Sequence, residues 1–442
     1  MTAFRKRLSP RLGLVVLSHP LEVGWQQAAS VLSSVSLQVS APDLSLLRAP
    51  CVISDPATAQ QVAQAFRDQD LHALLVIPAT WSADDPLLDL LEDLPLPVVV
   101  WGLPGVETGS LCGSHQINSV LKQLGRHCHL VYGALDAPSA HAEVAAFARA
   151  AALVRQLRQA KIALVGHRTP GMTEVAFDEF ALKTVLGPRV IHLSLEAFSQ
   201  LMDRSDPQAA QAQWDALASQ VAVVEVEPQE RTRQLQALVA MQALMQEHDL
   251  AGIAFECYPN WMGRVCIPFS ILSAQGLAAG CEADVNGTVA LVMLQSLAAA
   301  PGFNTDLLAV SGEDNSILLS HCGNSALSLA AQPSGARVAP VRLADKGACL
   351  LFPARPGRVT LANLLGASGS YRLTTIAAEA VPTGMDFPGN PLRVRLPIPV
   401  GDFLNLVGQE GIGHHWMAVY GHFAPELRHF SRLIGLRHLP IP

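Results

Sequence analysis

The sequence contains little charge: Asp, Glu, Lys and Arg make up 15% of its 442 residues, whereas 50% of the residues are hydrophobic. A chain of this composition has too little polar surface to stay disordered or extended. No Lys/Arg cluster is long enough to neutralise several phosphates, and the net charge is −7, so a nucleic-acid partner is not expected. The length allows two or three domains, each with its own core.

Long apolar runs and paired cysteines are missing as well. No stretch of about 18 apolar residues without a charge occurs, so the sequence predicts no membrane span. Basic residues at 5–7 precede the run LGLVVL, but this run is short and has no small-residue cleavage pattern, which indicates a first buried strand rather than a signal peptide. The eight cysteines form no CxxC and have no regular spacing. This is typical of reduced thiols, so we expect a cytoplasmic protein.

Short β-rich runs alternate with helix-like stretches through the first two thirds of the chain. Between 11 and 135, runs such as HALLVIPAT and PVVVWGLPG are separated by stretches such as QQVAQAFRDQ, which favours a parallel sheet covered by helices. A helical pattern over 138–160 leads into a new strand, KIALVGH, so a domain boundary is predicted near 158. The same alternation then continues, with helices expected over 174–187 and 268–279.

After about 335 the helical pattern disappears, and short segments such as GRVTLANLLG and YRLTTIAAEAVP are divided by Gly and Pro. This pattern predicts a small β-barrel or sandwich. The predicted fold is therefore α/β: two parallel-sheet, Rossmann-like α/β domains over 1–157 and 158–334, followed by a smaller, barrel-like β-rich domain over 335–442.

Acidic side chains stand between two apolar stretches in the segment GCEADVNGTVALVMLQSL, residues 280–297. Glu282 follows the stretch AQGLAAGC and precedes a helix, so its carboxylate can project from the carboxyl edge of a sheet, where open α/β sheets hold ligands. Alternatively, Asp284 and Asn286 cap the following helix, and Glu282 adds favourable charge at its positive end.

The next segment, NTDLLAVSGEDNSILLSHCGN, has the composition of a tight hairpin. A two-residue loop at Glu313-Asp314 would place Asp306 directly opposite His321, with Cβ atoms about 5 Å apart. Together with a second carboxylate on a neighbouring sheet edge, these side chains offer the N/O donors that Mn²⁺ accepts. The alternative is a plain cross-strand pair.

Three further segments are candidates for the same site. In GIGHHWMAVYGH, only one of His414 and His415 can face a given ion, because side chains alternate along a strand; both can also be ordinary core or surface histidines. Arg168, in the loop VGHRTPGM, can hold an anion, or the loop only shapes a turn. Glu256 and Trp261, in FECYPNWMGRVC, can line the same cleft or belong to the core.

The segments VGHRTPGM, CEADVNG, FNTDLL, SHCGN and GHHW together resemble the L-fucose isomerase and L-arabinose isomerase superfamily, in a short, fucose isomerase-like branch. The match runs in order from about residue 160 to the C-terminus, whereas the first 157 residues agree more in pattern than in motif. The resemblance implies three domains, a homo-oligomer (trimer or hexamer) with active sites near subunit contacts, and aldose–ketose isomerisation. The chain is shorter than well-known members, so its sugar is left open.

The resemblance also implies the site residues. A divalent metal ion, with Mn²⁺ as the first choice, is expected on Glu282, Asp306 and His415, and His321 corresponds to a further ligand of the arabinose branch. Glu256 stands in place of a Gln of fucose isomerases. The expected substrate contacts are Glu256, His414, Trp416 and Arg168.

Two carboxylates and a cation satisfy the needs of an aldose–ketose isomerase that acts through an enediol. Glu282 and Asp306 would be both ligands and proton carriers. Two alternatives remain: another metal-dependent carbohydrate enzyme, an aldolase or hydrolase, and a non-catalytic sugar-binding protein of the same fold.

Overall fold

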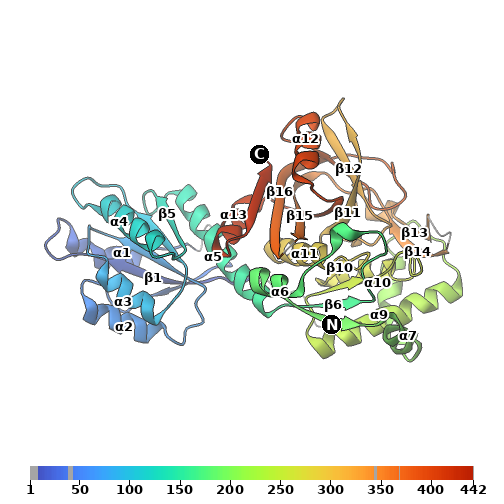
Figure 1. Ribbon diagram of the computed structural model, residues 1–442, viewed down its shortest axis with the longest axis horizontal. Helices are drawn as coiled ribbons and strands as arrows, with labels where there is room; N and C mark the ends of the chain where they lie inside the picture. Colours follow the sequence, from blue (N-terminus) through green and yellow to red (C-terminus); the bar gives the residue numbers. More distant parts are fainter. Residues whose placement is uncertain (1–7, 38–42, 343–345, 368, 442) are drawn as a thin grey trace. The chain divides into compact units, whose positions relative to one another are not determined.

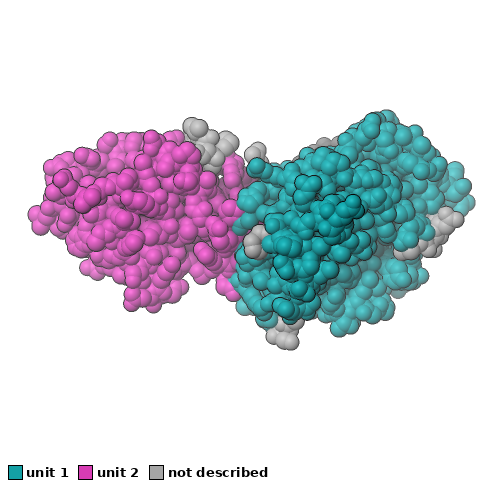
Figure 2. Space-filling model, turned by 90° about the horizontal axis from the view of Figure 1, so that it is seen from above, with its two compact units in different colours: residues 1–7, 157–424, 436–442 teal, residues 8–156, 425–435 magenta. Residues whose placement is uncertain are grey.

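The computed structural model describes residues 8–37, 43–342, 346–367 and 369–441. They form two compact units, shown in separate colours in Figure 2: unit 2 contains residues 8–156 and 425–435, and unit 1 contains residues 157–424 and 436–441. The second predicted domain and most of the third fall into unit 1, whereas residues 425–435 of the third belong to unit 2. The division into three domains stays a prediction. Within the described ranges, no helix is long and apolar enough to cross a bilayer.

Unit 2 is built on a parallel sheet with the strand order β2-β1-β3-β4-β5. The strands are β1 (Arg11–Leu17), β2 (Ser45–Arg48), β3 (Ala73–Pro78), β4 (Val98–Gly102) and β5 (Cys128–Tyr132). The helices are α1 (Ala28–Ser34), α2 (Pro56–Phe66), α3 (Asp85–Asp93), α4 (Ser110–Gln123), α5 (Pro138–Gln159), whose last residues belong to unit 1, and α13 (Ala424–Leu433). This is a doubly wound α/β sheet, as the sequence predicted.

Local sequence explains these elements. All six residues of β3, ALLVIP, are buried, because helices cover both faces of a parallel sheet and a strand inside it needs a continuous apolar run. Helix α2 begins with Pro56 after Asp55, whose carboxylate accepts the backbone N–H of Thr58 at 2.8 Å. The Thr58 hydroxyl accepts the N–H of Asp55 in return, which completes a capping box.

Unit 1 contains a second parallel sheet with the order β10-β9-β6-β7. Its strands are β6 (Lys161–Val165), β7 (Arg189–Leu193), β9 (Gly252–Phe255) and β10 (Ala278–Gly280). The helices of the unit are α6 (Glu179–Ala181), α7 (Leu195–Asp203), α8 (Gln211–Ala218), α9 (Pro228–His248), α10 (Cys266–Gln275), α11 (Val285–Ala298) and α12 (Val400–Glu410).

The rest of unit 1 is β-rich, as predicted, and closes into a barrel (Figure 1). Its strands, in ring order, are β15 (Gly357–Ala367), β18 (His415–Tyr420), β11 (Phe303–Ser311), β12 (Ser316–Ser320), β17 (Leu392–Arg395) and β16 (Ser370–Val381). The ring closes because β15 pairs with both β18 and β16. Strand β19 (Arg437–Ile441) joins β16 from outside. The hairpin β11–β12 thus belongs to the barrel, although it precedes residue 335.

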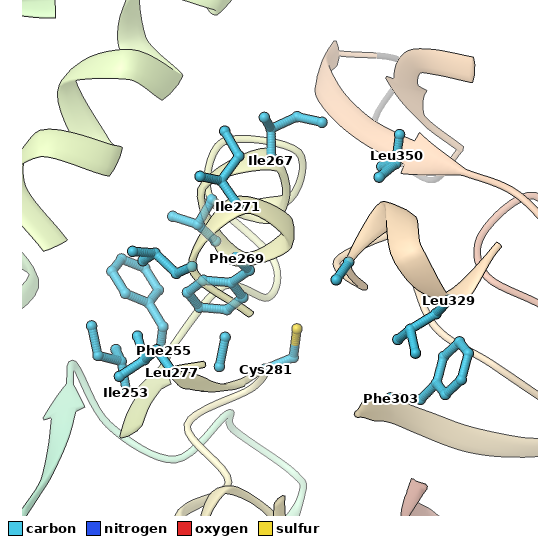
Figure 3. Close-up of a cluster of buried hydrophobic side chains, with 14 of the residues drawn as sticks. Ile253, Phe255, Ile267, Phe269, Ile271, Leu277, Cys281, Phe303, Leu329 and Leu350 are labelled. Carbon is cyan, nitrogen blue, oxygen red and sulfur yellow. The ribbon is translucent and has the colours of Figure 1, made fainter. Parts of the chain in front are cut away.

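The parallel sheet and the barrel share one core (Figure 3). Phe255 of β9, Phe269 of α10 and Phe303 of β11 all belong to a single cluster of buried side chains. Helix α11 contacts β9 and β10 on one side and β15 and β18 on the other. Every residue from 285 to 297 is buried, as expected for a helix that is apolar all round. A small sheet, β14 (Lys346–Leu351), β13 (Arg337–Val341) and β8 (Val223–Val224), completes the unit.

Candidate metal centre

Glu282 lies in the sharp connection between β10 and α11. Glu282 and Ala283 both have left-handed backbone conformations, with φ values of 60° and 58°, which residues with a Cβ rarely adopt. Hydrogen bonds hold this connection: the Ala283 N–H donates to Phe255 O at 2.9 Å, and the Glu282 N–H reaches Cys257 Sγ at 3.4 Å. Two consecutive strained residues are typical of functional sites, and here they turn the Glu282 carboxylate into the interior.

Asp284 has two roles. One oxygen of its side chain, Oδ1, accepts the N–H of Gly287 at 2.8 Å and caps α11. The other, Oδ2, lies 2.8 Å from His415 Nδ1. The Asp284 cap was considered from the sequence, whereas Asn286, considered as a cap of the same helix, instead donates to Ala176 O at 3.1 Å. The contact of Asp284 with His415 was not expected, because the residues are 131 positions apart.

The hairpin β11–β12 differs from the prediction at one point. Asp306 pairs with Ser320 instead of His321, because a β-bulge between Leu307 and Ala309 shifts the register by one residue. The predicted direct pair was therefore wrong. Since His321 directly follows the end of β12, its Nε2 still lies 4.0 Å from Asp306 Oδ1.

His415 begins β18, where it pairs with Asp306 of β11. Its Nε2 lies 2.9 Å from Glu282 Oε2 and 3.5 Å from Asp306 Oδ1. His321 Nε2 lies 4.0 Å from Glu282 Oε2. Glu282, Asp306, His321 and His415 thus present one ligand atom each, all within 4.8 Å of one another. The structure brings together the four residues that the sequence suggested as ligands.

The charges of these groups depend on one another. Burial opposes a charge on His415, but its hydrogen bonds to Asp284 and Glu282 raise its pKa to about 10. Burial likewise opposes a charge on Glu282, yet the nearby His321 and His415 hold the pKa of this carboxyl well below its usual range. The buried carboxylate of Glu282 and the buried imidazole of His415 therefore stabilise each other's charge when no ion lies between them.

The two histidines are arranged differently. His415 Nδ1 faces a carboxylate, so this nitrogen carries a proton, and the lone pair of Nε2 is free for an ion once the second proton leaves. His321 Nδ1 instead accepts the backbone N–H of Cys322 at 2.9 Å, so the proton of the neutral ring is on Nε2. In its neutral form, His415 thus offers a lone pair at Nε2, whereas neutral His321 offers an N–H there.

Two polar atoms in this cluster are buried without a hydrogen-bond partner: Asp306 Oδ1 and His321 Nε2. Such orphaned atoms are rare in folded proteins. A divalent cation would satisfy the carboxylate oxygen, and an oxygen acceptor would satisfy the imidazole N–H. Two carboxylates and an imidazole are also the donor set that Mn²⁺ and similar ions accept. The residues present therefore fit a metal ion.

The loop with Arg168 contacts the metal centre through a neighbour. Thr169 Oγ1 donates to the backbone oxygen of Glu282 at 3.3 Å, and Arg168 itself is exposed. Glu256 follows β9, which lies beside β6 in the sheet. Its Oε2 accepts the N–H of His167 at 2.7 Å, so Glu256 fixes the same loop.

The remaining two expected substrate contacts, His414 and Trp416, are the sequence neighbours of His415. The rings of His414 and His415 are 4.2 Å apart, and Glu174 binds both the ring and the backbone N–H of His414. Glu174 was not identified from the sequence, since it stands 240 positions away. Trp416 points to the other face of β18: its side chain is fully buried in the core, 6.2 Å from the ring of Phe403. The structure does not bring Trp416 to the site.

Comparisons with known proteins give one consistent group of relatives. The chain is 25% identical to a sulfoquinovose isomerase from Alkalicoccus urumqiensis over 77% of this chain and 80% of that protein. It is 23% identical to sulfoquinovose isomerases from Priestia aryabhattai, over 87% and 89%, and from Clostridium sp. (strain MSTE9), over 94% of each chain. No known family profile matches the chain.

Solved structures give only distant matches. A solute-binding protein of an ABC transporter from Agrobacterium vitis, bound with alpha-D-tagatopyranose, matches 66% of this chain and 90% of its own with 14% identity and a TM-score of 0.16. This score is too low to carry an argument about fold or ligand.

Proposed function

We propose that this protein is a metal-dependent aldose–ketose isomerase whose sugar carries an anionic group, with a sulfonate as the first candidate. The four sulfoquinovose isomerases among its relatives support an aldose–ketose isomerase, an enzyme of carbohydrate metabolism. The metal, the enediol route and the anionic group are the proposed parts. The observation that carries the metal and the enediol route is the convergence of Glu282, Asp306, His321 and His415 from four separate segments. The anionic group is supported by the sulfoquinovose isomerases among the relatives and by the exposed Arg168.

Glu282, Asp306 and His415 would hold the ion, and Mn²⁺ is the proposed one. When bound, a divalent cation stabilises negative charge that develops on neighbouring sugar oxygens. His321 is proposed as a donor beside the ion rather than a ligand, because its Nδ1 accepts the Cys322 N–H and its Nε2 carries the proton. The Nε2–H can then donate to a sugar oxygen.

The carboxylates carry the proton transfers. One of Glu282 and Asp306 removes the proton from C2 of the aldose. The electron pair of that C–H bond forms the C1–C2 double bond of an enediol, while the π pair of the C1 carbonyl moves to O1. The same group returns a proton to C1, while a second group moves the hydroxyl proton from O2 to O1, which yields the ketose without gain or loss of atoms. General acid–base catalysis of this kind contributes roughly 10² to 10⁴-fold.

Arg168 is the proposed partner of the anionic group. It is exposed in the loop after β6, and among the described residues no carboxylate is paired with it. Its neighbour Thr169 donates to the backbone of Glu282, so the loop is fixed at the metal centre while the guanidinium stays free. Arg is suited to sulfonates and phosphates because it donates several hydrogen bonds in a planar fork.

The test compares sulfoquinovose with quinovose, which lacks the sulfo group. Protein depleted of metal with EDTA and restored with Mn²⁺ should isomerise sulfoquinovose, and depletion should stop the reaction. Arg168→Gln should raise KM for sulfoquinovose about tenfold or more, as expected for a lost charge-assisted hydrogen bond, and leave its activity on quinovose unchanged. Arg204→Gln, at an exposed arginine after α7, is the matched control and should behave as wild type.

Other results would contradict the proposal in different ways. Turnover that is equal for both sugars and insensitive to Arg168→Gln would refute the anionic group but keep the isomerase. Cleavage of the sugar into two products would favour the aldolase or hydrolase alternative. A metal-loaded protein that binds sugars and converts none would favour the binding protein.

A further inference from the structure

A cavity of about 310 Å³ lies in unit 2, between the end of α4, the start of β5, α5 and α13. The charged or titratable side chains that line it, apart from one cysteine, are Lys122, Arg126, Arg432, His127, His129 and His429. None of the lining residues is acidic, although the chain as a whole has a net charge of −7. Three Lys or Arg side chains therefore line a cavity that has no acidic lining residue.

Two of the cations lack counterions. Among the described residues, no carboxylate is paired with Lys122 or Arg432, and both side chains are exposed. Arg126 donates to the backbone oxygen of Leu91 at 3.2 Å and pairs with Glu92, whose side chain is 77% exposed, so solvent screens that pair. Lys122 and Arg432 each stand in the last turn of a helix, where a cation is favourable. The helix position accounts for each of these two cations separately, but it does not account for their facing the same cavity.

One carboxylate, that of Glu143, lies close to His129 and His429. Glu143 Oε1 lies 3.0 Å from His429 Nε2, from His129 Nε2 and from Arg428 Nη2. Burial lowers the pKa of both His129 and His429, so the rings are neutral at neutral pH.

The same histidines and Glu143 are close enough to bind a metal ion, but the surroundings disfavour one. A cation would have to displace Arg428 from Glu143 and enter a cavity that already contains three unshielded or weakly shielded positive side chains. The same surroundings favour an anion, because it can pair with Lys122 and Arg432 and does not have to displace an existing ion pair.

We propose that this cavity is a second ligand site that binds a tetrahedral oxyanion group, a phosphate, sulfate or sulfonate, with Lys122 and Arg432 as its charged contacts. The volume is at the small end of ligand pockets, so the oxyanion fits either as a free ion or as part of a small organic molecule. The site consists only of unit 2 residues and does not depend on the proposed metal centre or its reaction.

Calorimetric titrations of the full-length, metal-free protein test this proposal. Inorganic phosphate, methanesulfonate and glucose 6-phosphate are titrated separately at constant ionic strength. Saturable binding of phosphate or methanesulfonate indicates a site for the free ion, whereas saturable binding of glucose 6-phosphate alone indicates that the organic part is also contacted. Either result supports the anion site when Lys122→Gln and Arg432→Gln weaken the binding. Saturable binding that neither variant weakens belongs to another site, such as Arg168, and would overturn the proposal, as would no saturable binding of any of the three.

Substitutions locate the site. Lys122→Gln and Arg432→Gln should each weaken binding about tenfold or more, because hydrogen bonds to charged groups are among the stronger ones. Both side chains are exposed, so the variants should fold, which thermal unfolding checks. Arg67→Gln is the control: this cation of unit 2 lies 3.8 Å from Asp93 and does not line the cavity. Equal weakening in all three variants would show unspecific charge attraction and refute the site.

A metal titration tests the alternative that His129, His429 and Glu143 bind a metal ion. Saturable Zn²⁺ binding that His429→Gln abolishes, together with no saturable binding of the anions, would assign the cluster to a metal and overturn the proposal. Activity of the Mn²⁺-loaded protein on sulfoquinovose is not part of this test, so the two proposals fail independently.

Discussion

Replacing Asp284 by Asn should weaken metal binding, although Asp284 is not itself a proposed ligand. The side chain has two acceptor oxygens, one for the Gly287 N–H and one for His415 Nδ1–H. Asn has a single oxygen and can serve only one of these donors. The substitution keeps the size of the side chain, so its effect is confined to hydrogen bonding.

The magnitude follows from the two orientations of the amide. If its oxygen stays on Gly287, the NH₂ group faces His415 Nδ1 and drives the ring proton to Nε2, which removes the lone pair that an ion needs. Loss of such an orienting partner typically weakens metal binding 10 to 100-fold, or about 1.4 to 2.8 kcal/mol. If the amide turns over, α11 loses its cap, at about 1 kcal/mol, and two N–H donors face each other. The amide adopts the orientation that costs less free energy. We therefore expect about a tenfold loss of Mn²⁺ affinity.

Calorimetric titration of Mn²⁺ into metal-free protein measures this loss, and thermal unfolding in chelator shows that the variant is folded. Asp55→Asn is the matched control, because Asp55 caps α2 in the same way but contacts no histidine. The reasoning would be refuted if Asp284→Asn bound Mn²⁺ as tightly as wild type.

Four further predictions concern other parts of the account. Glu282→Gln and Asp306→Asn should each nearly abolish turnover in steady-state assays, since each removes a proton carrier and a ligand charge; activity within a few-fold of wild type would contradict the roles. His321→Gln should lower kcat but keep Mn²⁺ affinity, whereas His415→Gln should lose the metal; equal metal loss in both variants would make His321 a ligand. Burial lowers the pKa of His429 to about 4, below its unfolded value of about 6.5. The unfolded state therefore binds a proton first, and stability measured by denaturant should fall as pH drops from about 6.5 to 4, less so in His429→Gln. Light scattering at micromolar concentration should show a homo-oligomer, and a monomer mass would contradict this.

Much of the fold could be predicted because the strand and helix patterns are local. Continuous apolar runs such as ALLVIP are buried along their whole length. Of the Gly- and Pro-divided segments after 335, those of β15, β16 and β17 form barrel strands, whereas β13 and β14 form a separate small sheet with β8. Two helical predictions were less accurate. The pattern over 174–187 contains only a 3₁₀ turn, the short α6 and a π-helical turn. The helix expected over 268–279 ends at Gln275, because Gly276 takes a left-handed conformation and β10 follows.

The site was harder to predict where it depends on contacts distant in sequence. Residue types and order indicated Glu282 and His415, but the bulge that moves Asp306 opposite Ser320 leaves no signal in composition. The bond from Asp284 to His415 required the barrel to close against α11. The cluster around Glu143 joins α5 to α13, 286 positions apart, and no local pattern marks it.

The proton transfer between C1 and C2 is the central claim, and isomerisation in D₂O tests it most directly. Mn²⁺-restored protein is incubated with sulfoquinovose, and mass spectrometry and NMR locate deuterium in the recovered aldose and ketose. If Glu282 and Asp306 carry the proton, solvent exchange at the carboxyl group should place deuterium at C1 of the ketose and C2 of the aldose, and chelation should stop both conversion and labelling. Metal-dependent conversion without any carbon-bound deuterium would show a hydride shift between the two carbons and contradict the roles of the carboxylates.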